Sequence, residues 1–234
     1  MARIVKKPDI RKSEILNSAQ RLFYQKGFEN TTVNEIISSA GIAKGTFYHY
    51  FKAKDDLISE IIDRYITQIA EEINFVLDDS GLPPTQKLNF FFLKAGFFKP
   101  GNKFLSSILV RLIYLDLNRL IKDQMISTYS NTMTPLLAQI LEEGNSKGNF
   151  YAGIPVYTAQ FIITAYLNLL EDLAQAVLNK KLESHERLML TEKSNTYSSA
   201  ICKILGIEEN SVSILDKELI DQYFQIFSSI QQSK

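Results

Sequence analysis

The chain has 234 residues and equal numbers of basic and acidic side chains, 26 of each, so its formal net charge is zero. A neutral balance taken alone argues against a nucleic-acid-binding protein, but the charge is divided unevenly. Residues 1–54 hold ten Lys and Arg against four Asp and Glu, a balance of +6, and the remainder holds 16 against 22, a balance of −6. A basic head on an acidic body predicts attachment to DNA by one end.

Several other classes of protein are disfavoured. The basic start lacks the apolar segment of a signal peptide, and the most apolar expected helix, residues 156–178, is interrupted by polar side chains. The single cysteine, Cys202, excludes an internal disulfide and suits a reducing cytoplasm. The two histidines, His49 and His185, lack the spacing of metal ligands, and no nucleophile–base pair or carboxylate dyad is recognisable. We therefore expect a cytoplasmic protein that is not an enzyme, with no metal, cofactor or membrane segment.

The first two expected helices are marked by their ends. The first begins at Pro8 and ends at Gly27, with an apolar stripe along one face. The second follows Thr32, because Thr32 and Glu35 form a T-x-x-E capping box that satisfies the free N–H groups of a helix start. Gly41 ends this helix, where a stop requires a positive φ that glycine adopts at low cost.

A third helix is predicted from Lys44, because Phe47 and Phe51 lie one turn apart and can face inward together. The residues left on its outer side are Lys44, Gly45, Thr46, Tyr48 and His49. A short helix that crosses another at a glycine turn, with a cationic, hydroxyl-bearing and aromatic outer face, is typical of major-groove recognition. Residues 1–54 are therefore predicted to form a three-helix helix-turn-helix DNA-binding domain.

The match is closer than a generic helix-turn-helix. Residues 40–57, AGIAKGTFYHYFKAKDDL, together with Thr31-Thr32 and Lys26-Gly27-Phe28, resemble the TetR family of bacterial transcription regulators. The resemblance covers about residues 9–60, and beyond them it is one of architecture only. It implies that the positions Thr32, Lys44, Tyr48, His49 and Lys54 touch DNA.

The full predicted DNA-binding set combines these positions with neighbours of suitable chemistry. It consists of Thr32, Asn34, Lys44, Gly45, Thr46, Tyr48, His49, Tyr50, Lys52 and Lys54. Lys54 and Tyr48 are expected at phosphates, and Lys44 and His49 at base edges. The family often has a capping residue where this chain has Ala43 and Ala53, and the loss of each cap costs roughly 1 kcal/mol. The basic residues 2–7 suit either a minor-groove arm or a disordered end.

Residues 55–234 are expected to form an all-helical effector-binding and dimerisation domain, which makes the whole chain all-α with about nine or ten helices. A helix from about Lys54 to Leu77 joins head and body and is the natural lever. After a break at Gly81–Pro84 comes another helix, then one or two from Lys103 to Asn131 with a kink near Asp116, and then one starting at Thr134-Pro135. The last expected helices are 154–179, 184–205 and 214–230.

Aromatic side chains recur at helical spacing in this body. They fit either ordinary core packing or an aromatic-walled pocket for a small, largely apolar effector, with polar residues inside apolar runs to orient it. The residues chosen for that pocket are Tyr65, Phe91, Phe98, Tyr114, Asp116, Tyr129, Phe161 and Asn168. For Asp116 and Asn168 the alternative, a surface or dimer-face position, is slightly favoured.

These features together predict a homodimeric regulator, a repressor that leaves its operator when the effector binds. One short reading helix recognises too few base pairs, whereas a two-fold dimer spaces two of them about one DNA turn apart. By similarity to the family, helices 154–179 and 184–205 are the expected interface, and the last helix either joins it or caps the body. The alternative is an architectural or cell-cycle DNA-binding protein of the same fold without an effector.

Overall fold

The computed structural model describes residues 7–96, 119–178 and 184–232, and these ranges contain helices and no strand. A small head is built from α1 (Pro8–Lys26), α2 (Val33–Ala40) and α3 (Lys44–Tyr50). The body contains α4 (Lys54–Leu77), α5 (Pro84–Ala95), α7 (Arg119–Ser146), α8 (Pro155–Leu178), α9 (Ser184–Leu205) and α10 (Lys217–Gln232). The predicted all-α class with a helix-turn-helix head is confirmed.

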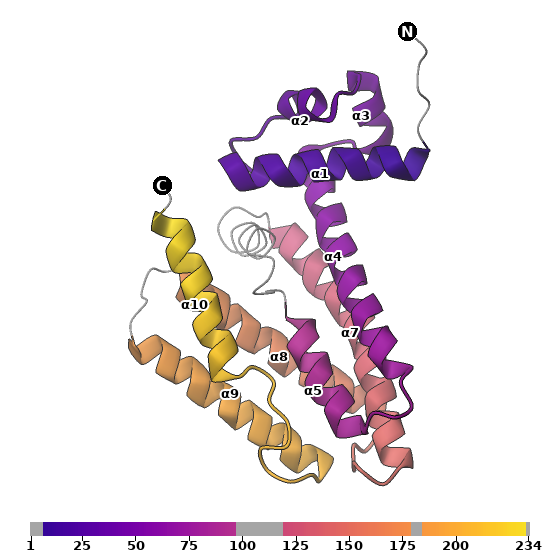
Figure 1. The fold of residues 1–234 in the computed structure, drawn as a ribbon, viewed down its shortest axis with the longest axis vertical. Helices are drawn as coiled ribbons and strands as arrows, with labels where there is room; N and C mark the ends of the chain where they lie inside the picture. Colours follow the sequence, from indigo (N-terminus) through magenta and orange to yellow (C-terminus); the bar gives the residue numbers. More distant parts are fainter. Residues whose placement is uncertain (1–6, 97–118, 179–183, 233–234) are drawn as a thin grey trace.

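Helix α4 is the element shared by head and body (Figure 1). Its first turns pack under α1, where Leu57 and Ile58 are fully buried with Ile15 and Phe47 of the head. It then runs on into the body, where it contacts both α5 and α7. The apolar side chains on its inner face are buried from Leu57 to Leu77. Helix α4 is therefore one continuous helix that is packed both in the head and in the body.

Helix α7 corrects the expectation that a new helix starts at Thr134-Pro135. The helix runs unbroken from Arg119 to Ser146 with Pro135 inside it. Pro135 removes one backbone N–H, but its ring and Asn131, whose carbonyl loses that donor, are both exposed. Met133 and Leu137 on the opposite face are fully buried, so packing on both sides of the proline holds the helix together. The kink expected near Asp116 lies outside the described residues.

The three C-terminal helices form the other side of the body (Figure 1), and α10 contacts both α8 and α9. The start of α10 is Lys217 rather than the expected Ile214. Asp216 Oδ1 accepts the N–H of Leu219 at 2.7 Å, which caps the helix there. Ile214 and Leu215 are buried ahead of it as part of the connection.

Four buried tyrosines from four different helices lie close together in the centre of the body. They are Tyr65 of α4, Tyr129 of α7, Tyr166 of α8 and Tyr223 of α10. Burial raises the pKa of all four phenols, so they remain neutral. The hydroxyl of Tyr129 donates to Ala95 O at 2.8 Å and that of Tyr166 to Phe92 O at 3.3 Å, so two of them satisfy carbonyls in the last turn of α5.

None of the helices in the described ranges has the length and apolarity that a membrane span requires. The same part of the chain holds no cluster of three or more His, Cys, Asp or Glu side chains that could bind a metal ion.

Candidate nucleic-acid interface

The start of α2 is closed by the predicted capping box. Glu35 N–H donates to Thr32 Oγ1 at 3.2 Å, and Thr32 N–H donates to Glu35 Oε2 at 2.8 Å. The ammonium of Lys26 binds the other oxygen of the Glu35 carboxylate. The pKa of Glu35 is lowered to about 2. The hydrogen bond from the Lys26 ammonium has the largest effect, and the backbone N–H of Thr32 has the next largest. The carboxylate therefore stays ionised, and able to accept these bonds, through the ordinary pH range.

The turn between α2 and α3 depends on Gly41. Its φ is +62° in the left-handed region, and its N–H donates to carbonyls in the last turn of α2. Ile42 follows with its N–H on Ile37 O at 3.2 Å and its side chain packed against the core. This geometry turns the chain so that α3 crosses α2 and presents one side to solvent.

Helix α3 is anchored by its two inward rings. Phe47 is fully buried and Phe51 nearly so, with their centroids 5.9 Å apart. Lys44, Gly45, Tyr48 and His49 are exposed, while Thr46 and Tyr50 are half-buried. The separation of inward from outward residues that the sequence predicts is therefore present. No atom lies within 4 Å of where a Gly45 side chain would begin, so this stretch of backbone is open to a close approach.

The two alanines at N-cap positions behave differently. Ala43 is the N-cap of α3 and has no side-chain acceptor, so no capping side chain accepts the first N–H groups of this helix. Ala53 also lacks a capping side chain, but Asp56 Oδ2 accepts the N–H groups of Lys52 at 2.7 Å and Ala53 at 3.1 Å. The start of α4 is thus capped from inside the helix, a contribution that the sequence reasoning missed.

Lys54 points differently from the other predicted DNA-binding residues. Thr32, Asn34 and Lys52 are exposed, as contact with DNA would require. The ammonium of Lys54 instead turns inward and donates to the carbonyl oxygens of the loop between α1 and α2. Of the ten predicted residues, seven are exposed, Thr46 and Tyr50 are half-buried, and the ammonium of Lys54 has an internal contact.

The identity of this domain follows from comparison with known families. Residues 15–61 match the model described as "Bacterial regulatory proteins, tetR family". The chain carries a TetR-family DNA-binding domain. The match spans α1 to the first turns of α4, which is the segment where the capping box, the Gly41 turn and the outer face of α3 are found.

Curated relatives extend the similarity in part. The chain is 27% identical over 149 residues to the HTH-type transcriptional repressor KstR2 of Mycolicibacterium smegmatis, covering 64% of this chain and 72% of that one. It is 38% identical over 79 residues to YerO of Bacillus subtilis, an uncharacterized HTH-type transcriptional regulator, covering 33% of this chain and 27% of that one. Both relatives are named as regulators of transcription.

Solved structures show the same fold along most of the chain. A TetR transcription regulator from Haloarcula marismortui has a TM-score of 0.60 at 15% identity, covering 96% of this chain and 98% of that one. FadR from Bacillus subtilis in complex with stearoyl-CoA has a TM-score of 0.56 at 21% identity, covering 77% and 94%. The body behind residues 15–61 therefore has the fold of these solved TetR regulators.

The residues predicted to bind an effector are divided by the structure. Tyr65, Phe91 and Tyr129 are buried in the centre of the body. Phe161 is 57% exposed and Asn168 is also exposed on the outside of α8, so these two do not join the buried rings. Asn168 Oδ1 accepts Lys193 Nζ at 2.7 Å and Tyr197 OH at 3.1 Å, both from α9. Phe98, Tyr114 and Asp116 lie outside the described residues.

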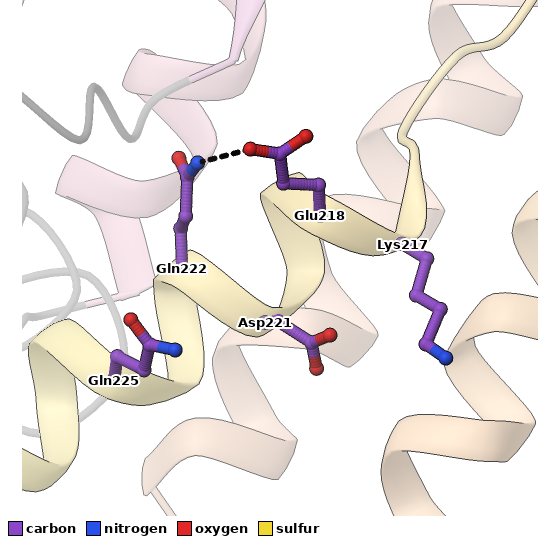
Figure 2. Close-up of a pocket in the computed structure, with 5 residues that line it drawn as sticks. All are labelled: Lys217, Glu218, Asp221, Gln222 and Gln225. Carbon is purple, nitrogen blue, oxygen red and sulfur yellow. Dashed lines mark hydrogen bonds between the residues drawn. The ribbon is translucent and has the colours of Figure 1, made fainter.

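A surface hollow that the sequence did not indicate lies on α10 (Figure 2). It is lined by Lys217, Glu218, Asp221, Gln222 and Gln225, and Gln222 Nε2 donates to Glu218 Oε1 at 3.4 Å. All five residues come from one face of one helix, and they are polar. Their chemistry does not match the apolar effector expected for the body.

Proposed function

We propose that the chain is a transcriptional repressor that binds operator DNA as a homodimer and releases it when a small, largely apolar effector enters the body. The observation that carries this proposal is the outer face of α3. Phe47 and Phe51 anchor the helix from within, so Lys44 and His49 project away from the core at the positions where a recognition helix reads base edges.

Phosphate contacts are expected around that helix. Tyr48 and Lys52 are exposed, and Thr32 lies at the exposed N-terminus of α2. The positive balance of residues 1–54 attracts the duplex to this end, whereas the acidic remainder disfavours other orientations. Repression rather than activation is supported by the relatives that are named as repressors, among them KstR2 of Mycolicibacterium smegmatis.

A dimer interface on α8 and α9 is supported by exposed apolar side chains. Tyr157 and Phe161 lie one turn apart on α8 and are 66% and 57% exposed, and Ile204 near the end of α9 is 40% exposed. A lone monomer gains nothing from aromatic rings in water, and covering them with the same rings of a second copy would stabilise a two-fold assembly. Helix α10 packs on α8 and α9 of its own chain.

An apolar effector is supported by the composition of the body's interior. Tyr65, Phe91 and Tyr129 provide buried aromatic surface next to α4 and α5. The similar fold of FadR from Bacillus subtilis is described in complex with stearoyl-CoA, a ligand with a long acyl chain. To release DNA, the effector must bind the spread dimer more tightly than the DNA-competent one, since equal affinity shifts no equilibrium.

Binding to duplexes from the region upstream of the chain's own coding sequence tests this function. We expect at least one to bind about a thousandfold more tightly than a shuffled duplex of the same length and composition. The affinity should fall by about 10³-fold or more between 50 and 200 mM salt, because a dimer that contacts six or more phosphates releases as many counterions.

Equal affinity for upstream and shuffled duplexes would contradict a repressor acting at its own locus. Specific binding that no apolar ligand weakens would favour the alternative, an architectural or cell-cycle DNA-binding protein of the same fold. The two outcomes can be told apart, because the first concerns DNA recognition by the head and the second concerns effector binding by the body.

A further inference from the structure

The ammonium of Lys54 donates all its hydrogen bonds to carbonyl oxygens inside the head. Its Nζ lies 2.6 Å from Phe28 O and 3.1 Å from Thr31 O, with Glu29 O at 3.5 Å. The same ammonium stands 4.0 Å from the centroid of the Phe28 ring. An ammonium has three donors, and here they converge on carbonyl oxygens of a single loop while an aromatic face supports the charge. A phosphate could bind this group only by replacing these contacts.

The loop that Lys54 holds leads directly into the DNA-binding face. Phe28 is buried and packs edge-on against Phe23, with ring centroids 5.2 Å apart. Thr31 is 1% exposed, and its Oγ1 donates to Gly27 O at 2.8 Å. The next residue is Thr32, the N-cap of α2. Lys54 is the first residue of α4, so its ammonium joins the start of the lever to the start of α2.

Lys52 provides the contrast two residues earlier. It is exposed, and its backbone N–H, rather than its ammonium, contributes to the cap of α4 by donating to Asp56 Oδ2 at 2.7 Å. The two lysines carry the same charge at the same end of α4, but one faces water and the other faces the loop. Their effects on DNA binding should therefore differ in kind.

We propose that Lys54 is a positioning residue, which ties the N-terminus of α4 to the loop before α2 so that Thr32 and Asn34 move with α4, and that Lys52 rather than Lys54 neutralises phosphate. The inference rests on the proposed DNA-binding function and deepens it. A displacement of α4 in the body reaches α2 through this tie, in addition to reaching α3 through the chain connection. Because the Lys54 ammonium stays on its carbonyls in the complex, it releases no counterion.

The salt dependence of operator binding distinguishes the two lysines. Lys54→Arg retains the charge, but a planar guanidinium cannot direct its donors to carbonyls that converge on one point. We expect Lys54→Arg and Lys54→Met each to bind the operator about tenfold more weakly, with the slope of log affinity against log salt unchanged. Lys52→Met, the matched control, should reduce that slope by about 0.9 for each phosphate contact removed. Wild-type affinity for Lys54→Arg, together with a reduced slope for Lys54→Met, would overturn the proposal.

Hydrogen exchange without DNA tests the tie directly. In Lys54→Met, the N–H groups of Glu35 and Ile36, which donate to Thr32, should exchange at least several-fold faster than in the wild type. The amides of α7 and α8 report that the variant is folded, and Lys52→Met should leave the α2 amides unchanged. Unaltered exchange in α2 of a folded Lys54→Met protein would refute the tie. If the wild type binds no operator, the proposed function fails, while this exchange measurement still decides the role of Lys54.

Discussion

Replacing Gly144 by alanine is expected to lower the free energy of unfolding by about 3 kcal/mol. Gly144 lies in the last turn of α7, and a Cβ built there would stand 1.9 Å from Phe150 Cδ2 and 2.6 Å from Phe150 Cγ. The ring cannot move away easily, because Phe150 is 2% exposed and its N–H donates to Gly144 O at 3.2 Å. The substitution therefore displaces either the connection from α7 to α8 or the end of α7 itself.

Urea unfolding followed by circular dichroism measures this effect, and Gly45→Ala is the matched control. Gly45 is also helical, but nothing lies within 4 Å of its Cβ position. The control should be neutral or more stable by up to about 1 kcal/mol, since alanine favours a helix over glycine. If Gly144→Ala is within 0.5 kcal/mol of the wild type, roughly the range of harmless surface changes, the close packing of Phe150 on α7 is wrong.

The second large effect is expected for Lys87→Met, at about 2 kcal/mol of lost stability. Lys87 is 2% exposed, and its Nζ donates to Leu77 O at 2.8 Å and to Glu143 Oε2 at 2.9 Å. It thus joins the last residue of α4 to α5 and α7. Methionine keeps the aliphatic stem but leaves the Leu77 carbonyl without this donor in a buried setting. The loss stays below that of a fully broken buried ion pair, because Lys147 still binds Glu143.

Lys147→Met is the control for that variant. Lys147 binds the same carboxylate at 2.6 Å, but its side chain is 46% exposed. Its hydrogen bond has the largest effect among the contacts that lower the pKa of Glu143. An exposed pair of this kind nevertheless contributes at most about 0.5 kcal/mol to the free energy of unfolding. Thermal unfolding of the two variants should therefore separate them clearly. Equal losses would mean that the buried bond to Leu77 O contributes nothing and that α4 is not anchored at its far end by Lys87.

The head could be predicted from sequence because its signals are local. The T-x-x-E capping box needs only Thr32 and Glu35, and the left-handed turn needs only Gly41, so the bounds of α2 and α3 follow from a few neighbours. The same reasoning located α4 and α9 correctly. The cap from Asp56 was not predicted, because the carboxylate that accepts the N–H of Ala53 lies three residues beyond the N-cap position and not at it.

The remaining features depend on contacts between residues far apart in the chain. Thr134-Pro135 resembles a helix start, but burial of Met133 and Leu137 against other helices keeps α7 continuous. A lysine at position 54 has the charge expected of a phosphate contact. Only its position over the Phe28 ring shows that its ammonium faces inward. Phe161 has an apolar side chain of the kind usually found in a core, and only the packing of α8 places it on the surface. A side chain's direction is set by its tertiary neighbours, which spacing alone does not reveal.

A base-pair scan of the bound operator shows whether α3 reads the DNA sequence. Each position of the tightest-binding duplex is substituted in turn, and the affinities of the wild type and of Lys44→Ala are measured at one salt concentration. We expect the wild type to lose about 1–3 kcal/mol of binding free energy at clustered positions in two symmetric half-sites, and Lys44→Ala to lose its preference at particular base pairs. Losses that are uniform along the duplex, or a Lys44→Ala protein that is weaker on every duplex by the same factor, would contradict base reading by α3.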